Sequence, residues 1–223
     1  MNIYIILLVT FGMLGAFTSI AQTNNTDKLD IEICGIVSRT YELGPSLGEG
    51  DISNWDNTPL KSLAKAAKEG DTVLMKQIID TADVDLDTPD PIYGNSLLHW
   101  TVLNRLYDAP KFLLEHGSNP NFHSKLSGLS PFILACSQCG NQKDLELLKQ
   151  MLYYGADPND APNFNPQFTG HVFLEFKLTP LTAACKGINP LFHGSDRIYY
   201  LKAIQLLLEN MVPSALPGEL FLF

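Results

Sequence analysis

The chain of 223 residues carries 24 acidic against 15 basic side chains, which gives a net charge of −9 and an isoelectric point near 4.9. This length predicts one domain, or one domain with an appendage. Such acidity offers no electrostatic footprint for phosphate backbones and argues against nucleic-acid binding. Four cysteines are too few for a disulfide-built scaffold, so a hydrophobic core must hold the fold.

Residues 3–21 form an apolar segment without a charged side chain. Ser19 and Ala21 place small residues three and one positions before a cut at Gln22, a pattern typical of a secretory signal peptide at residues 1–21. We therefore expect export to the periplasm or the cell exterior. The segment has no Lys or Arg before it, and about 19 apolar residues also suffice to span a bilayer. An uncleaved membrane anchor is the alternative.

Residues 22–57 are interpreted as a lead-in segment that packs along the domain edge, because glycines interrupt it and only residues 31–37 resemble a strand. At Thr58 the pattern changes. Thr58 followed by Pro59 predicts the start of a helix, with threonine as its cap and proline in its first position. Helices are expected to dominate from there.

A seven-residue segment recurs along the chain. It is Ser-Leu-Leu-His-Trp-Thr-Val from Ser96, Ser-Pro-Phe-Ile-Leu-Ala-Cys from Ser130 and Thr-Pro-Leu-Thr-Ala-Ala-Cys from Thr179. A second apolar-periodic segment follows each copy, and two of these end in turns that begin at Gly117 and Gly155. The Ser or Thr can cap a helix, and the glycine can end one in the left-handed conformation. Two short helices cannot bury their apolar face alone, so such units must stack.

This pattern resembles the ankyrin repeat family, with its Thr-Pro-Leu-His segment, its Leu-rich second helix and its Gly-Ala-Asp-x-Asn turn. The resemblance covers residues 58–211. It implies an all-α fold, a solenoid of stacked helix-turn-helix units with hairpin loops, in which about three full repeats follow a degenerate N-terminal cap.

The chain departs from the family pattern at several points. The family's turn histidine is present only as His99, and the first turn, at residues 80–82, lacks a glycine. Insertions lengthen the loop at residues 160–178 and separate two helices at residues 187–194. The apolar tail at residues 212–223 either folds back over the last repeat or marks truncation relative to a longer parent.

The resemblance implies a protein-binding face built from hairpin tips and the exposed side of each first helix. A hairpin that packs its own aromatic residues is the alternative for the long loop, and packing of hairpin leucines under the lead-in is the alternative for the tips. The candidate hairpin positions are Tyr93, Asn95, Leu126, Ser127, Leu129 and Phe176, the helix positions are Leu103, Asn104, Ser137 and Gln138, and the long loop adds Phe164, Phe168 and His171.

Cys136 and Cys139 match the C-x-x-C spacing of redox and metal sites. Cys136 falls late in its expected helix, where the dipole does not stabilise a thiolate, and no further ligands for a zinc site are evident. In an oxidising compartment Cys34 and Cys139 can form a disulfide. We expect no enzymatic activity, metal or cofactor.

The sequence thus predicts an exported, monomeric, non-enzymatic scaffold that binds another protein. The negative charge favours a basic partner, and the compartment suggests an inhibitor or immunity protein for a secreted toxin or enzyme. The alternatives are a scaffold tethered to a membrane by residues 3–21 and a thiol-redox or metal protein that uses Cys136 and Cys139.

Overall fold

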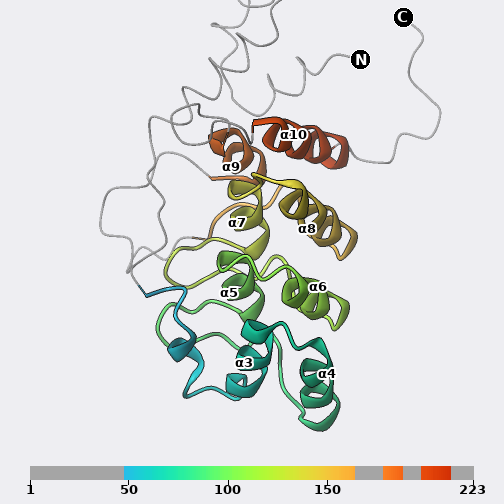
Figure 1. The fold of residues 1–223 in the computed structure, drawn as a ribbon. Helices are drawn as coiled ribbons and strands as arrows, with labels where there is room; N and C mark the ends of the chain where they lie inside the picture. Colours follow the sequence, from blue (N-terminus) through green and yellow to red (C-terminus); the bar gives the residue numbers. More distant parts are fainter. Residues whose placement is uncertain (1–47, 164–177, 188–196, 212–223) are drawn as a thin grey trace, which may run out of the picture.

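The computed structural model describes residues 48–163, 178–187 and 197–211, and the regular elements within these ranges are all helical (Figure 1). The predicted signal peptide, the first part of the lead-in, most of the long inserted loop and the tail lie outside the described residues. The elements are η1 (Ile52–Trp55), α3 (Lys61–Glu69), α4 (Thr72–Thr81), α5 (Leu97–Leu103), α6 (Asp108–Glu115), α7 (Pro131–Ser137), α8 (Gln142–Tyr153), α9 (Pro180–Gly187) and α10 (Arg197–Met211).

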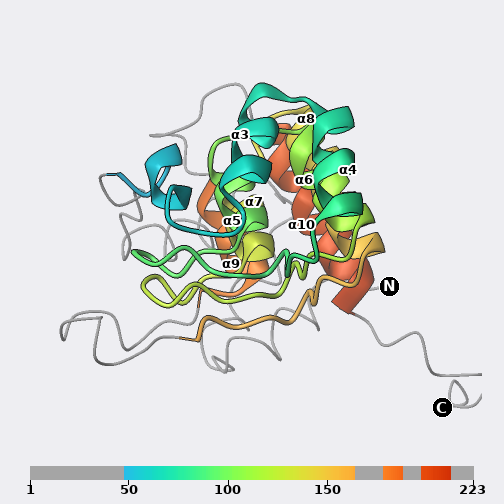
Figure 2. The same ribbon diagram turned by 90° about the horizontal axis from the view of Figure 1, so that it is seen from below.

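The helices form two parallel columns. The first helices of the units, α3, α5, α7 and α9, stack in one column, and α4, α6, α8 and α10 stack beside them in the other (Figure 1). Each first helix also contacts its own second helix. Seen from below in Figure 2, the loops between units extend to one side of the columns as layered hairpins. The predicted all-α solenoid is confirmed.

Local capping explains where the helices begin. The Ser96 hydroxyl oxygen accepts the backbone N–H of His99 at 3.2 Å, and Ser130 accepts that of Ile133 in the same way. Thr179 plays this role for α9. Each cap satisfies an N–H group that has no partner inside the helix, as the repeat pattern predicts.

The first helix begins later than predicted. Thr58 does not cap it, because its hydroxyl donates to the carbonyl of Trp55 at 2.9 Å. Residues 58–60 form a turn instead, and α3 starts at Lys61 after an N-cap position, Leu60, without a side-chain hydrogen bond. The reason is the preceding η1 element, because the carbonyl of its last residue, Trp55, accepts both the N–H and the hydroxyl of Thr58 and holds Thr58 in the turn after η1.

Small side chains allow the first helices to lie close together. Ala66, Ala135 and Ala184 occupy equivalent positions in three units, and all three are buried in one continuous hydrophobic core.

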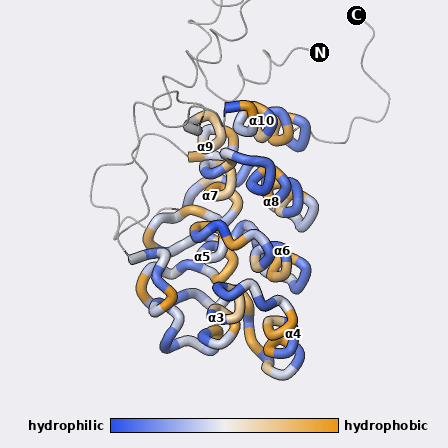
Figure 3. Tube along the Cα trace, in the orientation of Figure 1, coloured by the Kyte–Doolittle hydropathy of each residue, from blue (hydrophilic) through white to orange (hydrophobic). Residues whose placement is uncertain are grey.

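Hydrophobic and hydrophilic stretches alternate along the helices in Figure 3, as amphipathic helices require. Among the described helices, none combines the length and the apolar character needed to cross a bilayer.

The glycine turns at the ends of the second helices also form as predicted. Gly117 and Gly155 adopt left-handed conformations with φ of 95° and 89°. The turns of neighbouring units are joined, because the backbone N–H of Asp157 donates to the Asn121 side chain at 2.9 Å. Stacking therefore involves the turns as well as the helices.

The hairpins are joined by backbone hydrogen bonds. The N–H of Leu126 donates to the carbonyl of Tyr93 at 3.1 Å, and the Ser124 hydroxyl donates to the same carbonyl. Gly94, which follows Tyr93, has φ of 70°, and a Cβ on Gly94 would lie 2.6 Å from the Cβ of Lys125 in the next hairpin. Close stacking of these hairpins thus depends on glycine at position 94.

We predict that Gly94→Ala destabilises the fold far more than Gly70→Ala. Both glycines have nearly the same φ, but a Cβ on Gly70 meets no atom within 4 Å. Gly70→Ala should cost about 1 kcal/mol of unfolding free energy from backbone strain, and Gly94→Ala about 2–4 kcal/mol because a steric clash is added. Urea unfolding followed by circular dichroism measures both. Equal losses would mean that the two hairpins do not stack closely.

Candidate functional site

The inner face of the solenoid is the side of the first-helix column that points away from the second helices, together with the hairpins that extend from it (Figure 2). Residues 48–57, the end of the lead-in, lie on this face. We call them the strap. It runs beside α5 and α3 as the blue segment of Figure 1.

The strap is shaped by its own hydrogen bonds. The Asp51 carboxylate accepts the N–H of Ser53 and caps η1. The Asn54 side-chain amide donates to the carbonyls of Gly48, at 2.9 Å, and Glu49, at 3.2 Å. Because these bonds are internal, the strap presents a preformed turn to the inner face.

Three contacts join the strap to the second unit. The Asn95 side-chain amide donates to the Glu49 carboxylate at 3.0 Å, and the Trp100 indole N–H donates to the carbonyl of Gly50 at 3.1 Å. The rings of Trp55 and Trp100 pack edge to face with their centroids 6.5 Å apart. Both tryptophans are buried. The strap therefore combines aromatic packing with polar anchors, one of which is a buried carboxylate.

The identity of residue 100 explains why the strap lies there. In the repeat pattern Trp100 is equivalent to Lys65, Leu134 and Ala183. This position is exposed at Lys65, half-buried at Leu134 and buried at Ala183. At Trp100 the strap supplies contacts to the ring, so without the strap part of this large apolar ring would face solvent. Burying such a ring is worth several kcal/mol at about 25 cal/mol per Å² of apolar surface. The strap provides that burial.

Part of the predicted binding face is consequently covered. Asn95 is 1% exposed and cannot contact a partner in this structure, so its predicted role as an exposed position is wrong. Tyr93 is half-buried next to Gly48, and Asn104 keeps its exposure while its side chain borders Gly50. The polar groups expected to face a partner here face the strap.

Leu129 is a second correction. It is 8% exposed and belongs to the hydrophobic core, because its carbonyl accepts the N–H of Ser124 and turns the residue beneath the hairpin. The repeat pattern indicates the hairpin but does not distinguish its tip from its base.

The remaining predicted positions that the structure describes form the uncovered part of the inner face. Ser137 is anchored locally, because its hydroxyl donates to the carbonyl of Leu134 at 2.7 Å. Phe164, Phe168, His171 and Phe176 lie outside the described residues. The half-buried positions are Leu103, Leu126, Ser127, Ser137 and Gln138.

One exposed apolar residue at a hairpin was missed. Ile92 is 64% exposed and immediately precedes Tyr93. An isoleucine in a turn between Pro91 and Tyr93 was a usable signal, because turns are normally polar. With Leu126 in the next hairpin, Ile92 gives this face apolar character.

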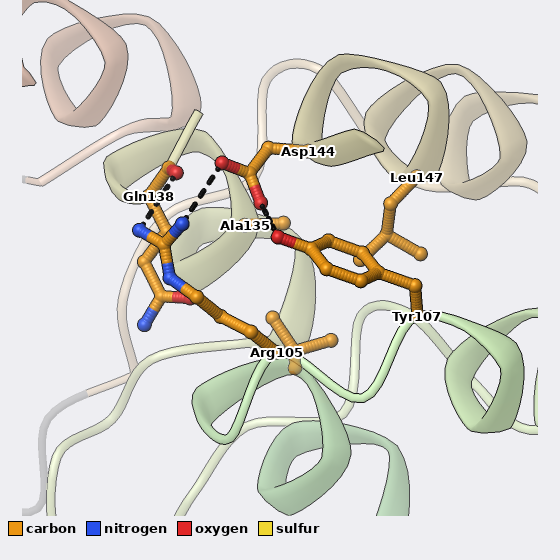
Figure 4. A pocket seen from close by; sticks show the side chains of 7 residues that line it. Arg105, Tyr107, Ala135, Gln138, Asp144 and Leu147 are labelled. Atoms are coloured by element: carbon orange, nitrogen blue, oxygen red, sulfur yellow. Dashed lines mark hydrogen bonds and ion pairs between the residues drawn. The ribbon is translucent and has the colours of Figure 1, made fainter. Parts of the chain in front are cut away.

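A buried carboxylate joins the second and third units, and its hydrogen bonds are drawn in Figure 4. Asp144 is buried at the start of α8 and accepts hydrogen bonds from Arg105, Tyr107 and the N–H of Gly140, at 3.1, 2.9 and 3.0 Å. Arg105 also donates to the carbonyl of Gln138. Its φ of 55° is left-handed, which brings its side chain across to α8.

The hollow beside this network has a volume of about 10 Å³, enough for about one water molecule. It therefore suits a structural water and not a substrate. Its lining residues are Val102, Arg105, Tyr107, Ala135, Gln138, Asp144 and Leu147.

The cysteines do not form a reactive site. Burial raises the pKa of Cys136 well above its ordinary value, and burial followed by the charge of Asp144 raises the pKa of Cys139 to about 12. Both are free thiols, as is Cys185. Cys34, the expected disulfide partner of Cys139, lies outside the described residues. The described residues contain no group of three His, Cys, Asp or Glu side chains placed to hold a metal ion.

His99 is a buried histidine of the second unit. Burial lowers its pKa from 6.5 to about 4, so the ring is neutral at pH 7. Its Nε2 lies 3.9 Å from the Glu49 carboxylate, too far for a hydrogen bond.

Comparison with known proteins agrees with this architecture. Residues 63–161 match the family model for ankyrin repeats in three copies. This segment consists of ankyrin repeats. The pair α9 and α10 lies beyond the matched residues but packs on the preceding units in the same way. Ankyrin repeats are protein-interaction modules, so this match implies a scaffold for protein–protein interaction.

Two relatives show the same repeats. A putative ankyrin repeat protein of Rickettsia felis is 32% identical over 91 residues, which are 38% of this chain and 40% of that protein. Palmitoyltransferase akr1 of Schizosaccharomyces pombe is 38% identical over 60 residues, which are 27% of this chain and 9% of that protein. The chain thus spans less than half the length of either relative.

We predict that Asp144→Ala destabilises the chain by about 3 kcal/mol, because it leaves the charge of Arg105 and two further donors without their acceptor. Glu146→Ala is the matched control. Glu146 is an exposed carboxylate on the same helix that accepts one side-chain hydrogen bond from Gln142. Its loss should change stability by less than about 0.5 kcal/mol. Urea unfolding separates the two, and similar losses would contradict the structural role of Asp144.

We also predict that Cys136, Cys139 and Cys185 resist alkylation by iodoacetamide at neutral pH, because all three are buried and the pKa values of Cys136 and Cys139 are raised. Site-resolved peptide mass spectrometry compares the folded chain with the chain in urea. Rapid labelling of Cys136 or Cys139 in the folded chain would restore the redox interpretation.

Proposed function

We propose that this ankyrin-repeat scaffold acts after export and binds a basic protein through the uncovered part of its inner face. The observation that carries the proposal is the apolar character of successive hairpins, with Ile92 exposed and Leu126 half-buried. The two hairpins are joined by the bond from the Leu126 N–H to the Tyr93 carbonyl, and apolar side chains gathered on neighbouring hairpins are typical of protein-binding sites. Half-buried Ser137 and Gln138, at the end of α7, are polar candidates for the same interaction.

Export is supported by the apolar segment at residues 3–21 and by the small residues that precede Gln22. A membrane-tethered scaffold, held by the same segment without cleavage, is the second candidate. The mass of the exported chain distinguishes the two, because processing before Gln22 removes the whole apolar segment.

The preference for a basic partner rests on charge. Residues 1–22 contain no Asp, Glu, Lys, Arg or His, so the processed chain retains the full −9. Complementary charge raises association rates and disfavours acidic competitors. An acidic monomer that acts outside the cytoplasm suits the role of an inhibitor or immunity protein for a secreted toxin or enzyme.

The thiol-redox alternative has little support. The raised pKa values of Cys136 and Cys139 keep both thiols protonated near neutral pH, and a protonated thiol is a poor nucleophile and metal ligand.

We predict that the immobilised chain, starting at Gln22, captures a specific basic protein from the secreted fraction of its source cells, and that Leu126→Glu weakens this capture at least about tenfold. Tyr153→Glu is the control, because Tyr153 is 82% exposed at the end of a second helix. Affinity is measured by surface plasmon resonance with the captured protein.

Capture of no specific protein would overturn the proposal. Equal weakening by the two variants would place the interface elsewhere.

A further inference from the structure

The strap occupies inner-face surface that a partner would otherwise reach. It contacts Asn95 and Trp100, which are more than 40 positions away in sequence, and it borders Asn104. The contact also contains Trp55 and Trp100, which are the two tryptophans of the whole chain. Whether the strap is docked can therefore be followed by intrinsic fluorescence.

The docked strap leaves polar atoms unsatisfied. Trp55 Nε1, Asn95 Oδ1 and His99 Nδ1 are buried and have no hydrogen-bond partner within the described residues. Buried polar groups normally find partners, and each one that does not lowers the stability of the arrangement that buries it. Trp55 belongs to the strap, and Glu49 of the strap lies against Asn95 and the Nε2 side of His99, so release of the strap would open these residues to water. The aromatic packing favours the docked strap, whereas the burial of these unsatisfied polar atoms disfavours it.

His99 makes this balance depend on protonation. Of the nearby carboxylates, Glu49 lies 3.9 Å from Nε2, and Asp90 is committed to the backbone N–H groups of Ile92, Tyr93 and Asn95. The neighbouring helices α3 and α6 carry their charged residues at the surface, and α7 has none. An imidazolium at this position would have Glu49 for one N–H but no acceptor for the N–H at Nδ1.

We propose that the strap is a cover that leaves the inner face when the chain is acidified. Release would expose Trp100 and Asn95, which are buried, beside Asn104, which is exposed already, and so extend the binding surface toward the first unit. That release controls partner binding rests on the proposed function. Release itself can be measured without a partner.

The effect of pH on strap release follows from how many protons the docked and released forms bind. Docked His99 has a pKa of about 4, against 6.5 for an unburied histidine. Between these values the released form binds more protons, so falling pH shifts the equilibrium toward release. Full titration of this difference corresponds to a shift of up to about 300-fold.

The test follows the chain that starts at Gln22 from neutral pH down to about pH 4, with tryptophan emission, acrylamide quenching and far-ultraviolet circular dichroism. We expect the emission to shift to the red and quenching to rise below pH 6.5 while the helical signal stays constant. Hydrogen–deuterium exchange, corrected for intrinsic rates, should rise in residues 48–57 and not in α7. No spectral change, or a change that coincides with loss of helix, overturns the proposal.

Two variants identify the titrating group. His99→Gln should abolish the spectral transition, whereas His116→Gln, which changes an exposed histidine at the end of α6, should leave it intact. Glu49→Gln should retain a transition, since the trigger remains. If Glu49→Gln abolishes it and His99→Gln does not, the assignment to His99 is wrong. If His99→Gln fails to fold, the exchange measurement on the unchanged chain still decides.

Failure of this inference is distinguishable from failure of the proposed function. Partner capture without any spectral release overturns the cover alone. Release without partner capture overturns the binding function alone.

Discussion

A large aromatic ring on the inner face of the second unit determines how this solenoid is covered. Trp100 stands at a position where the other units carry lysine, leucine or alanine, and its side chain contacts Gly50 and Trp55 of the strap. Water is a poor environment for such a ring, and the strap packs Trp55 against it. Burial of Asn95 and the place of Glu49 both follow from this packing.

The rest of the stack obeys the ordinary physics of repeat proteins. Each pair of helices has an apolar side that only its neighbours can cover, so stability is shared between adjacent units. Small residues at the helix contacts, hairpins joined by backbone hydrogen bonds and the buried carboxylate of Asp144 connect one unit to the next. The buried carboxylate of Asp144 therefore serves to join neighbouring units, and the small hollow lies beside this contact.

Features that depend on local sequence were predictable. The caps at Ser96 and Ser130 and the left-handed glycines at 117 and 155 follow from short motifs whose geometry is set within one turn. Features that depend on distant contacts were not. Thr58 was predicted to cap a helix, but its hydroxyl donates to the carbonyl of Trp55 at the end of η1. Asn95 looked exposed, and only the position of Glu49, 46 residues earlier, shows that it is covered.

The central claim is that Trp55 and Trp100 interact directly and hold the strap on the inner face. A double-mutant cycle with Trp55→Ala, Trp100→Ala and the double variant measures that interaction in urea unfolding. The account predicts that the two losses are not additive and that the coupling is about 1 kcal/mol or more. Additive losses, with no coupling beyond experimental error, would contradict it.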